Sequence, residues 1–218
     1  MIALGLPAGP LAVLCIGAHP DDVEIGCGGM LLELAARPET TVSTVVLTAA
    51  SAERRREAEE ASPQFFPGAR VTVLDLPDGR LPEHWGAAKA ALEALSQTEQ
   101  PDVLFVPRRD DAHQDHRLIG QLSSTVWRNS LLLHYEIPKW DADLTPPTHY
   151  VPVSEANAHR KVELLNLSYP TQRSRDWWDD ELFLGLMRLR GVEARSKYAE
   201  GFSATKVILG LDGESGER

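Results

Sequence analysis

Five short runs rich in Val, Ile and Leu constrain the fold more than any other feature of this chain. They lie at residues 11–17, 42–48, 70–76, 103–107 and 131–135. Most positions in each run are apolar, rather than every second one. Continuous apolar runs of this length are typical of parallel strands that helices cover on both faces. We therefore predict a mostly parallel sheet.

Helical patterns lie between these strands. They cover residues 29–36, 53–61, 85–95 and 116–127. The alternation of strand and helix predicts an open, doubly wound α/β sheet.

The last third of the chain is less regular. Four prolines indicate a loop over residues 138–152, and helices are expected at about 155–167 and 180–191. A final strand is expected near 204–209, and the tail at 212–218 is expected to be frayed. Because the sequence has no internal repeat and no clear domain boundary, we predict one domain over residues 1–218, with its core at about 11–209.

Composition and charge exclude several classes of protein. The 218 residues carry a formal charge of −10 and no basic stripe, so nothing attracts the chain to nucleic acid or anionic lipid. No segment is apolar for long enough to span a membrane, and the first 18 residues lack the positive charge of a signal peptide. Cys15 and Cys27 are too few for a disulfide framework. We expect a cytoplasmic enzyme.

Two clusters of His and Asp follow the first and fourth predicted strands. Residues 17–24 read GAHPDDVE, and residues 111–117 read DAHQDHR. In an open α/β sheet, ligands bind at the carboxyl ends of the strands, where the strand order reverses. In the common strand order, the first and fourth strands flank that point. We therefore predict that the two clusters meet in one site.

The residue types in these clusters favour a catalytic zinc site. Zinc in such sites is held by imidazoles and a carboxylate, with one position left open. His19 and Asp22 lie three residues apart in a turn stiffened by Pro20, so they can chelate together, and one His of the second cluster would complete the set. Neither cluster contains Cys, and an all-oxygen magnesium or calcium site would not need so many imidazoles.

The remaining members of the clusters then have chemical roles. A carboxylate beside the metal can take a proton from water whose pKa the metal lowers toward about 7. A His off the metal can stabilise an oxyanion or protonate a leaving amine, and a neighbouring carboxylate can orient that His. These residue types alone leave open which His binds the metal.

Structural interpretations compete with these. Taken singly, His19 could begin a helix and Asp21 or Asp22 could cap it. The glycine-rich residues 26–29 lack the spacing of a dinucleotide-binding loop, and we interpret them as close packing at a helix start. The pair Trp177 and Trp178 fits either a wall that stacks on sugars or the core.

The motifs resemble those of the LmbE-like, or PIG-L, family of N-acetylglucosaminyl deacetylases. The resemblance is carried by AHPDDVE at residues 18–24 with Gly28-Gly29, and by His113-x-Asp115-His116. Weaker similarity continues at Lys161, at YPTQ in residues 169–172 and at YAEGF in residues 198–202, so it covers roughly residues 11–209.

The resemblance implies a Rossmann-like fold, one zinc ion per chain and release of the free amine from an N-acetylglucosamine unit. The zinc ligands it implies are His19, Asp22 and His116. It also implies that Asp21 is the general base, that His113 is the oxyanion stabiliser or general acid, and that Asp115 orients His113.

The same resemblance implies two substrate-binding residues, Arg54 and Gln172. Arg55 and Arg56 adjoin Arg54, so the sequence does not decide which of the three faces the substrate. Thr171 stands where Ser is common in the family. The substrate implied is a small-molecule or conjugated amino sugar, and the sequence does not identify the group attached to that sugar. A homo-oligomer is compatible with the sequence.

Other functions differ in what they require. A zinc amidase for another small N-acyl amine would use the same residues with a different pocket. A scaffold protein without catalysis would not need both Asp21 and His113. A nucleotide-binding protein would need a glycine-rich phosphate loop where residues 19–22 lie.

Overall fold

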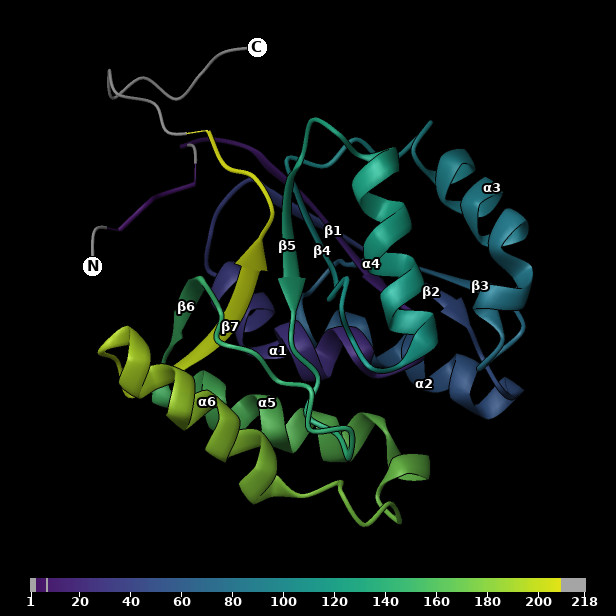
Figure 1. Ribbon diagram of the computed structural model, residues 1–218. Coiled ribbons are helices and arrows are strands. Elements are labelled where there is room, and N and C mark those ends of the chain that lie inside the picture. Colours follow the sequence, from purple (N-terminus) through teal and green to yellow (C-terminus); the bar gives the residue numbers. More distant parts are fainter. Residues whose placement is uncertain (1–2, 7, 209–218) are drawn as a thin grey trace.

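One seven-stranded sheet organises the molecule. The computed structural model describes residues 3–6 and 8–208. The strand order is β3-β2-β1-β4-β5-β7-β6 (Figure 1). The strands are β1 (Leu11–Gly17), β2 (Thr40–Thr48), β3 (Arg70–Leu76), β4 (Val103–Pro107), β5 (Leu131–Tyr135), β6 (His149–Val153) and β7 (Tyr198–Ala204). The first five are parallel, and β7 runs antiparallel to β5 and β6. The predicted mostly parallel α/β sheet is confirmed.

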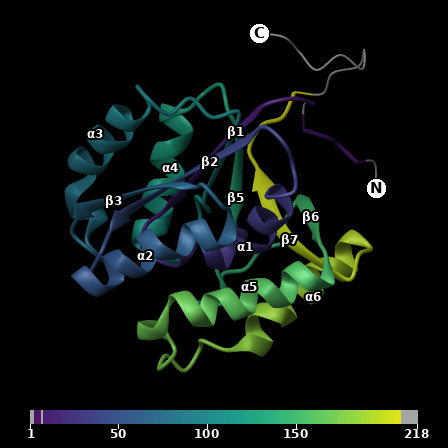
Figure 2. The ribbon, with the colours of Figure 1, turned by 180° about the vertical axis from the view of Figure 1, so that it is seen from behind.

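Helices cover both faces of the sheet. They are α1 (Asp22–Leu34), α2 (Ala52–Phe65), α3 (Trp85–Leu95), α4 (Gln114–Val126), α5 (Glu155–Ser168) and α6 (Asp180–Ala194), with short 3₁₀ helices η1 (Leu81–His84) and η2 (Pro170–Gln172). One hydrophobic core lies between the sheet and α3 and α4. The other lies on the opposite face, under α1, α2, α5 and α6 (Figures 1 and 2).

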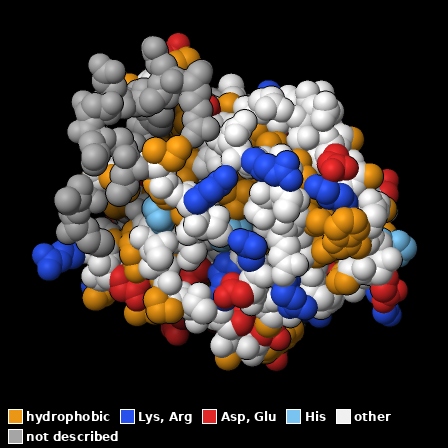
Figure 3. Space-filling view, turned by 45° about the horizontal axis from the view of Figure 1, so that its top comes forward, with side chains coloured by type: hydrophobic (Ala, Val, Ile, Leu, Met, Phe, Trp, Pro, Cys, Tyr) orange, Lys and Arg blue, Asp and Glu red, His pale blue; other side chains and the backbone are white. Residues whose placement is uncertain are grey.

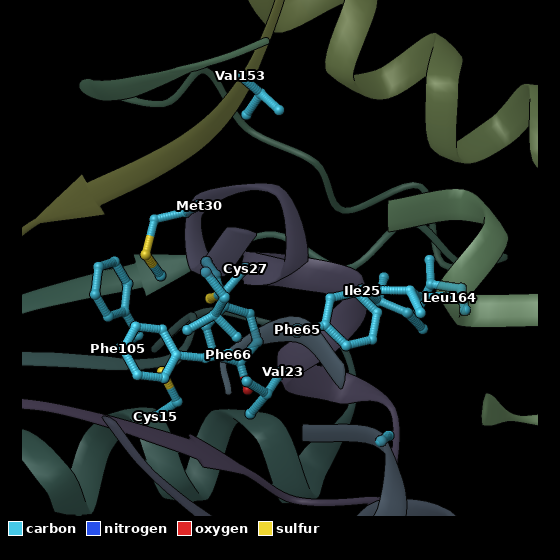
Figure 4. Close-up of a cluster of buried hydrophobic side chains, with 14 of the residues drawn as sticks. Cys15, Val23, Ile25, Cys27, Met30, Phe65, Phe66, Phe105, Val153 and Leu164 are labelled. Atoms are coloured by element: carbon cyan, nitrogen blue, oxygen red, sulfur yellow. The ribbon is translucent and has the colours of Figure 1, made fainter. Parts of the chain in front are cut away.

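The larger core surrounds α1. Figure 4 shows side chains from β1, β4 and α2 gathered around this helix, among them Cys15, Phe105 and Phe65. Every residue from Asp22 to Leu31 is buried. Because neighbouring elements surround α1, its polar side chains must find partners inside the protein.

Helix α1 differs from the prediction, because it begins at Asp22 and not at residue 29. Glycines are poor helix formers, so the pattern at residues 26–29 suggested a later start. Tertiary packing explains their presence. A Cβ atom on Gly26 would overlap the Tyr135 ring, and one on Gly28 would lie 2.8 Å from the Phe65 ring. The interpretation of these glycines as close packing is supported, while the predicted helix start is wrong.

The carboxyl-terminal strands also differ from the prediction. The expected strand near 204–209 is β7, which ends at Ala204, and β6 lies inside the stretch expected to be a loop. Pro152 lies on β6, the edge strand, where a residue without an amide hydrogen is tolerated. Residues 209–218, including the tail expected to be frayed, lie outside the described residues.

The helices and one face of the surface bear on what a membrane span requires. None of the helices in the described part of the chain is both long and apolar enough to cross a bilayer. Figure 3 turns the top of Figure 1 toward the viewer, and hydrophobic side chains there lie in separate patches among charged ones.

Close packing of α1 predicts opposite effects for two helical Gly→Ala substitutions. Gly26→Ala forces Tyr135 to move, so it should lower the free energy of unfolding by about 1–3 kcal/mol. Gly185→Ala on α6 is the matched control, because its Cβ meets no atom within 4 Å and it should gain up to about 1 kcal/mol from helix propensity. Urea denaturation measures both, and equal gains in stability would contradict the packing described for α1.

Candidate active site

The two His/Asp clusters meet where the strand order reverses. Strand β1 pairs with β2 on one side and β4 on the other. The carboxyl ends of β1 and β4 therefore lie side by side, and they bring His19 Nδ1 within 3.2 Å of His116 Nε2. The ring of His113 lies 4.8 Å from that of His19 and 4.5 Å from that of His116, between centroids. The predicted convergence is confirmed.

Asp22 ties the turn after β1 to helix α4. Its Oδ2 accepts hydrogen bonds from the backbone amides of Ala18 and His19, at 2.8 and 2.9 Å. Its Oδ1 lies 3.2 Å from His116 Nε2. Burial alone raises the pKa of Asp22, but His116 and His19 outweigh burial and hold the pKa well below its usual value. Asp22 is therefore an ionised carboxylate directed at two imidazoles.

The spacing of these side chains fits a metal ion. The three distances are 3.2 Å for His19 Nδ1–His116 Nε2, 3.2 Å for His116 Nε2–Asp22 Oδ1 and 3.5 Å for His19 Nδ1–Asp22 Oδ2. A tetrahedral zinc with ligands at about 2.0–2.1 Å holds neighbouring ligand atoms about 3.3–3.4 Å apart. Two further groups of ligand atoms lie within 4.8 Å of one another: His19 with His113 and His116, and His19 with Asp78 and Asp115. The two distances that involve Asp22 join different oxygens of its carboxylate, and the geometry admits more than one choice of metal ligands.

A second layer of charged residues holds His116. Its Nδ1 makes no hydrogen bond within the described residues but lies at ion-pair distance, 3.3 Å, from Asp111 Oδ2, and Asp111 Oδ1 lies 3.0 Å from Lys139 Nζ. Carboxylates commonly orient ligand imidazoles in this way. Asp111 opens the second cluster but was not among the predicted site residues, and no local signal in the sequence indicates Lys139.

Two carboxylates lie against the other ring nitrogen of His19. Asp78 Oδ1 lies 3.1 Å from Nε2 and Asp115 Oδ2 lies 3.3 Å from it. Asp78 was missed from the sequence. It follows β3, and its position just after a parallel strand is the signal that could have found it.

Asp115 differs from its expected placement beside His113. Its carboxylate contacts His19 and accepts a hydrogen bond from the Leu81 amide at 3.1 Å. It is the backbone amide of Asp115 that donates to His113 Nδ1, at 3.3 Å. The cause is local, because His113 is the N-cap residue of α4 and its ring accepts from the first turn of that helix.

This capping hydrogen bond determines which ring nitrogen of neutral His113 carries the hydrogen. Burial and the neighbouring His116 lower the pKa of His113, which favours the neutral ring. Since Nδ1 accepts a hydrogen bond, the neutral ring carries its hydrogen on Nε2. His113 can therefore donate a hydrogen bond through Nε2.

Asp21 has a strained backbone. Its φ is 97°, in the left-handed region, and it occupies the N-cap position of α1 without making a capping hydrogen bond. Its carboxylate instead pairs with Arg54 at 2.7 Å. Such conformations cost about 1–3 kcal/mol and concentrate at functional sites. Burial raises the pKa of Asp21 to about 6, with Arg54 opposing the rise and Asp22 adding to it.

Only one of the three consecutive arginines faces this site. Arg54 pairs with Asp21 and with Glu57, at 2.7 Å each, and donates to the Pro20 carbonyl. Arg55 turns to the backbone of β3, where it donates to the Val73 carbonyl at 2.6 Å, and Arg56 is exposed. The structure thus separates three residues that the sequence could not.

Gln172 lies close to the same group of residues. Its Nε2 donates to Thr171 Oγ1 at 3.1 Å, and Thr171 Oγ1 donates to Glu57 Oε2 at 2.7 Å. Arg54, Glu57, Thr171 and Gln172 therefore form one connected polar group beside Asp21.

Comparison with known proteins places the chain in a family. The PIG-L family model, described as GlcNAc-PI de-N-acetylase, matches residues 14–127, which include both His/Asp clusters and Arg54. The chain belongs to this family, and the resemblance drawn from the motifs is confirmed.

Individual relatives agree with this assignment. The chain is 31% identical over 138 residues to the uncharacterized deacetylase YaiS of Escherichia coli, covering 58% of this chain and 74% of that protein. It is 29% identical over 126 residues to a diacetylchitobiose deacetylase of Thermococcus kodakarensis, covering 50% of this chain and 46% of that protein. This chain therefore spans less than half the length of the latter.

Solved structures show the same fold. A conserved protein of Thermus thermophilus superposes with a TM-score of 0.73 at 25% identity, covering 94% of this chain and 100% of that one. The N,N′-diacetylchitobiose deacetylase of Pyrococcus horikoshii superposes with a TM-score of 0.71 at 24% identity, covering 89% of this chain and 83% of that one.

Proposed function

We propose that this protein is a zinc-dependent N-deacetylase. It would hydrolyse the N-acetyl amide of an N-acetylglucosamine-type sugar or conjugate, releasing acetate and the free amine. The observation that carries the proposal is the convergence of ligand atoms from His19, Asp22 and His116 beside the buried carboxylate of Asp21. Membership of the PIG-L family, and the deacetylase names of its relatives, support the reaction class.

In this proposal His19, Asp22 and His116 hold the metal. Zinc bound there would supply a Lewis acid that polarises the amide carbonyl and lowers the pKa of water toward about 7. Asp111 would orient His116, and Asp115 with Asp78 would orient His19, each through the ring nitrogen turned away from the metal.

Asp21 would act as the general base. It adjoins a ligand without being one, and a pKa of about 6 leaves it ionised at neutral pH yet able to take a proton. It would accept the proton of the attacking water and pass it to the leaving nitrogen as the C–N bond breaks. Arg54 holds the carboxylate in place and favours its charged form.

His113 would stabilise the negative charge that develops on the carbonyl oxygen. Its neutral ring carries the hydrogen on Nε2, because Nδ1 accepts from the Asp115 amide. A preorganised donor at such a position is worth about 100- to 1,000-fold in rate.

Adjacent carboxylates should respond differently to amide substitution. Asp21→Asn keeps the left-handed backbone, which Asn tolerates, and should retain zinc while losing about 100- to 10,000-fold in turnover. Asp22→Asn should lose zinc instead. Elemental analysis measures the zinc content of each variant. Turnover is measured as acetate release from N-acetylglucosamine, N,N′-diacetylchitobiose and a panel of N-acetyl amino acids.

Three results would contradict parts of this proposal. Loss of metal in Asp21→Asn with retention in Asp22→Asn would mean that the two roles are exchanged. Turnover of Asp21→Asn at the parent rate would remove the base. Activity confined to N-acetyl amino acids would replace the sugar deacetylase with a zinc amidase for another N-acyl amine.

The pH profile should report the Arg54–Asp21 pair. Asp21 must be ionised to act, so kcat/KM should fall as pH drops through its pKa, at about 6 or below because a bound cation lowers it further. Arg54→Gln removes a positive charge that lowers the pKa of Asp21. The fall of kcat/KM at low pH, the acid limb of the profile, should therefore move to higher pH. Arg55→Gln is the control, since Arg55 contacts β3 and should leave the limb in place. An unmoved limb in Arg54→Gln would refute the coupling.

The second layer should affect metal affinity. Asp111→Asn weakens the contact that orients His116, so zinc should bind about 10- to 100-fold more weakly. Asp110→Asn, an exposed neighbour, provides the control. Competition with a chromophoric chelator measures both affinities, and equal affinities in the two variants would argue against His116 as a ligand.

A further inference from the structure

The structure separates the two adjacent tryptophans that the sequence could not. Trp178 is 7% exposed, its indole N–H donates to Asn166 Oδ1 at 3.0 Å, and its ring packs on Phe183 at 5.1 Å between centroids. It belongs to the core. Trp177 is half-buried, and its ring lies edge-to-face against Trp140, with 6.0 Å between centroids and 74° between planes. Trp140 is 64% exposed.

Trp140 belongs to a segment that is tied to the metal-binding side of the site. This segment, residues 136–148, joins β5 to β6. Its Lys139 pairs with Asp111 at 3.0 Å, and its Asp143 accepts from the Ala112 amide at 2.8 Å and pairs with Lys139 at 3.0 Å. These contacts on both sides hold Trp140 in place although its ring is exposed.

Trp177 belongs to a segment that is tied to the opposite side. Residues 173–179 follow η2, and Thr171 in η2 is bonded to Glu57 through its backbone amide at 2.9 Å and its hydroxyl at 2.7 Å. Glu57 pairs with Arg54, which pairs with Asp21. This segment is thus connected, through Glu57 and Arg54, to the carboxylate proposed as the base.

The two indoles meet at the ends of two chains of contacts that lead away from the site. One chain runs Asp22–His116–Asp111–Lys139 and reaches Trp140 as the next residue. The other runs Asp21–Arg54–Glu57–Thr171 and reaches Trp177 six residues further along the sequence. Figure 1 shows both segments at the end of the sheet toward which β5 points, which is the end that carries the site. The segments that carry the tryptophan pair thus lie at the same end of the sheet as the site, where Trp140 presents an exposed apolar ring.

An exposed indole held in this way suits a particular kind of ligand. It offers a flat apolar face with a polar N–H at its edge, and its position is fixed before any ligand binds, which reduces the entropic cost of binding. A sugar ring has the complementary form, with C–H groups on its faces and hydroxyls around its rim. The Asp111–Lys139 layer separates Trp140 from His116, so a ring on the platform lies beyond the group that reacts.

We propose that Trp140 and Trp177 form a stacking platform for a second sugar ring, linked to the acetylated amino sugar whose amide lies at the His/Asp centre. This rests on the proposed deacetylase function and deepens it by assigning the substrate class. The preferred substrates are disaccharides or longer glycans, and Trp140 is the residue that distinguishes them from the monosaccharide.

Binding can be measured without turnover. In the Asp21→Asn background with zinc bound, calorimetry gives the dissociation constants of N-acetylglucosamine and N,N′-diacetylchitobiose, and tryptophan fluorescence reports whether an indole is covered. The disaccharide should bind more tightly than the monosaccharide. Trp140→Ala should reduce that ratio about tenfold, as expected for the loss of one stacked ring. Trp140→Phe should restore most of the ratio, and Leu189→Ala, which truncates an exposed side chain on α6, should leave it unchanged.

The outcomes distinguish failure of the stacking platform from failure of the proposed deacetylase function. An unchanged ratio in Trp140→Ala overturns the platform, even where acetate is released from acetylated sugars. Failure of both sugars to bind also overturns it. A ratio that falls in Trp140→Ala and recovers in Trp140→Phe supports the platform even if the parent protein releases no acetate, in which case the deacetylase function is what fails.

Discussion

The burial of helix α1 is the constraint on which the rest of the site depends. Its N-cap and first turn carry carboxylates that the surrounding elements exclude from water, and an unpaired buried charge is costly. Each carboxylate therefore takes a partner from a different element. Asp22 meets His116 of α4, Asp21 meets Arg54 of α2, and Glu24 accepts from the Tyr169 hydroxyl at 2.7 Å. These pairings bring distant parts of the chain to the end of β1.

The same constraint gives two adjacent residues unlike properties. His116 and His19 hold the pKa of Asp22 well below its usual value, while burial brings the pKa of Asp21 to about 6 despite Arg54. The left-handed backbone at Asp21 turns the two carboxylates toward different partners. Neighbouring carboxylates whose environments move their pKa values apart are suited to different roles, here metal binding and proton transfer.

The middle of α1 is joined to the carboxyl-terminal third by a buried ion pair. Lys161 Nζ lies 2.7 Å from Glu200 Oε1 and donates to the Ile25 carbonyl, while Glu200 accepts from the amides of Gly29 and Met30. The glycines leave room for this approach, since a Cβ on Gly29 would lie 3.0 Å from Glu200. The part of the chain beyond the family match thereby fixes the helix that presents Asp21 and Asp22.

The sequence by itself determined the parallel strands and the meeting of the two His/Asp clusters, because apolar periodicity and the position of a residue after its strand are local properties. Only the tertiary structure selected Arg54 over Arg55, set the Asp115 carboxylate against His19 and added Asp78, Asp111 and Lys139 around the site. It also divided Trp177 from Trp178, and it placed helix-breaking glycines inside a helix. These outcomes depend on which way a side chain points and on what lies opposite it, and residues far apart in the chain decide both.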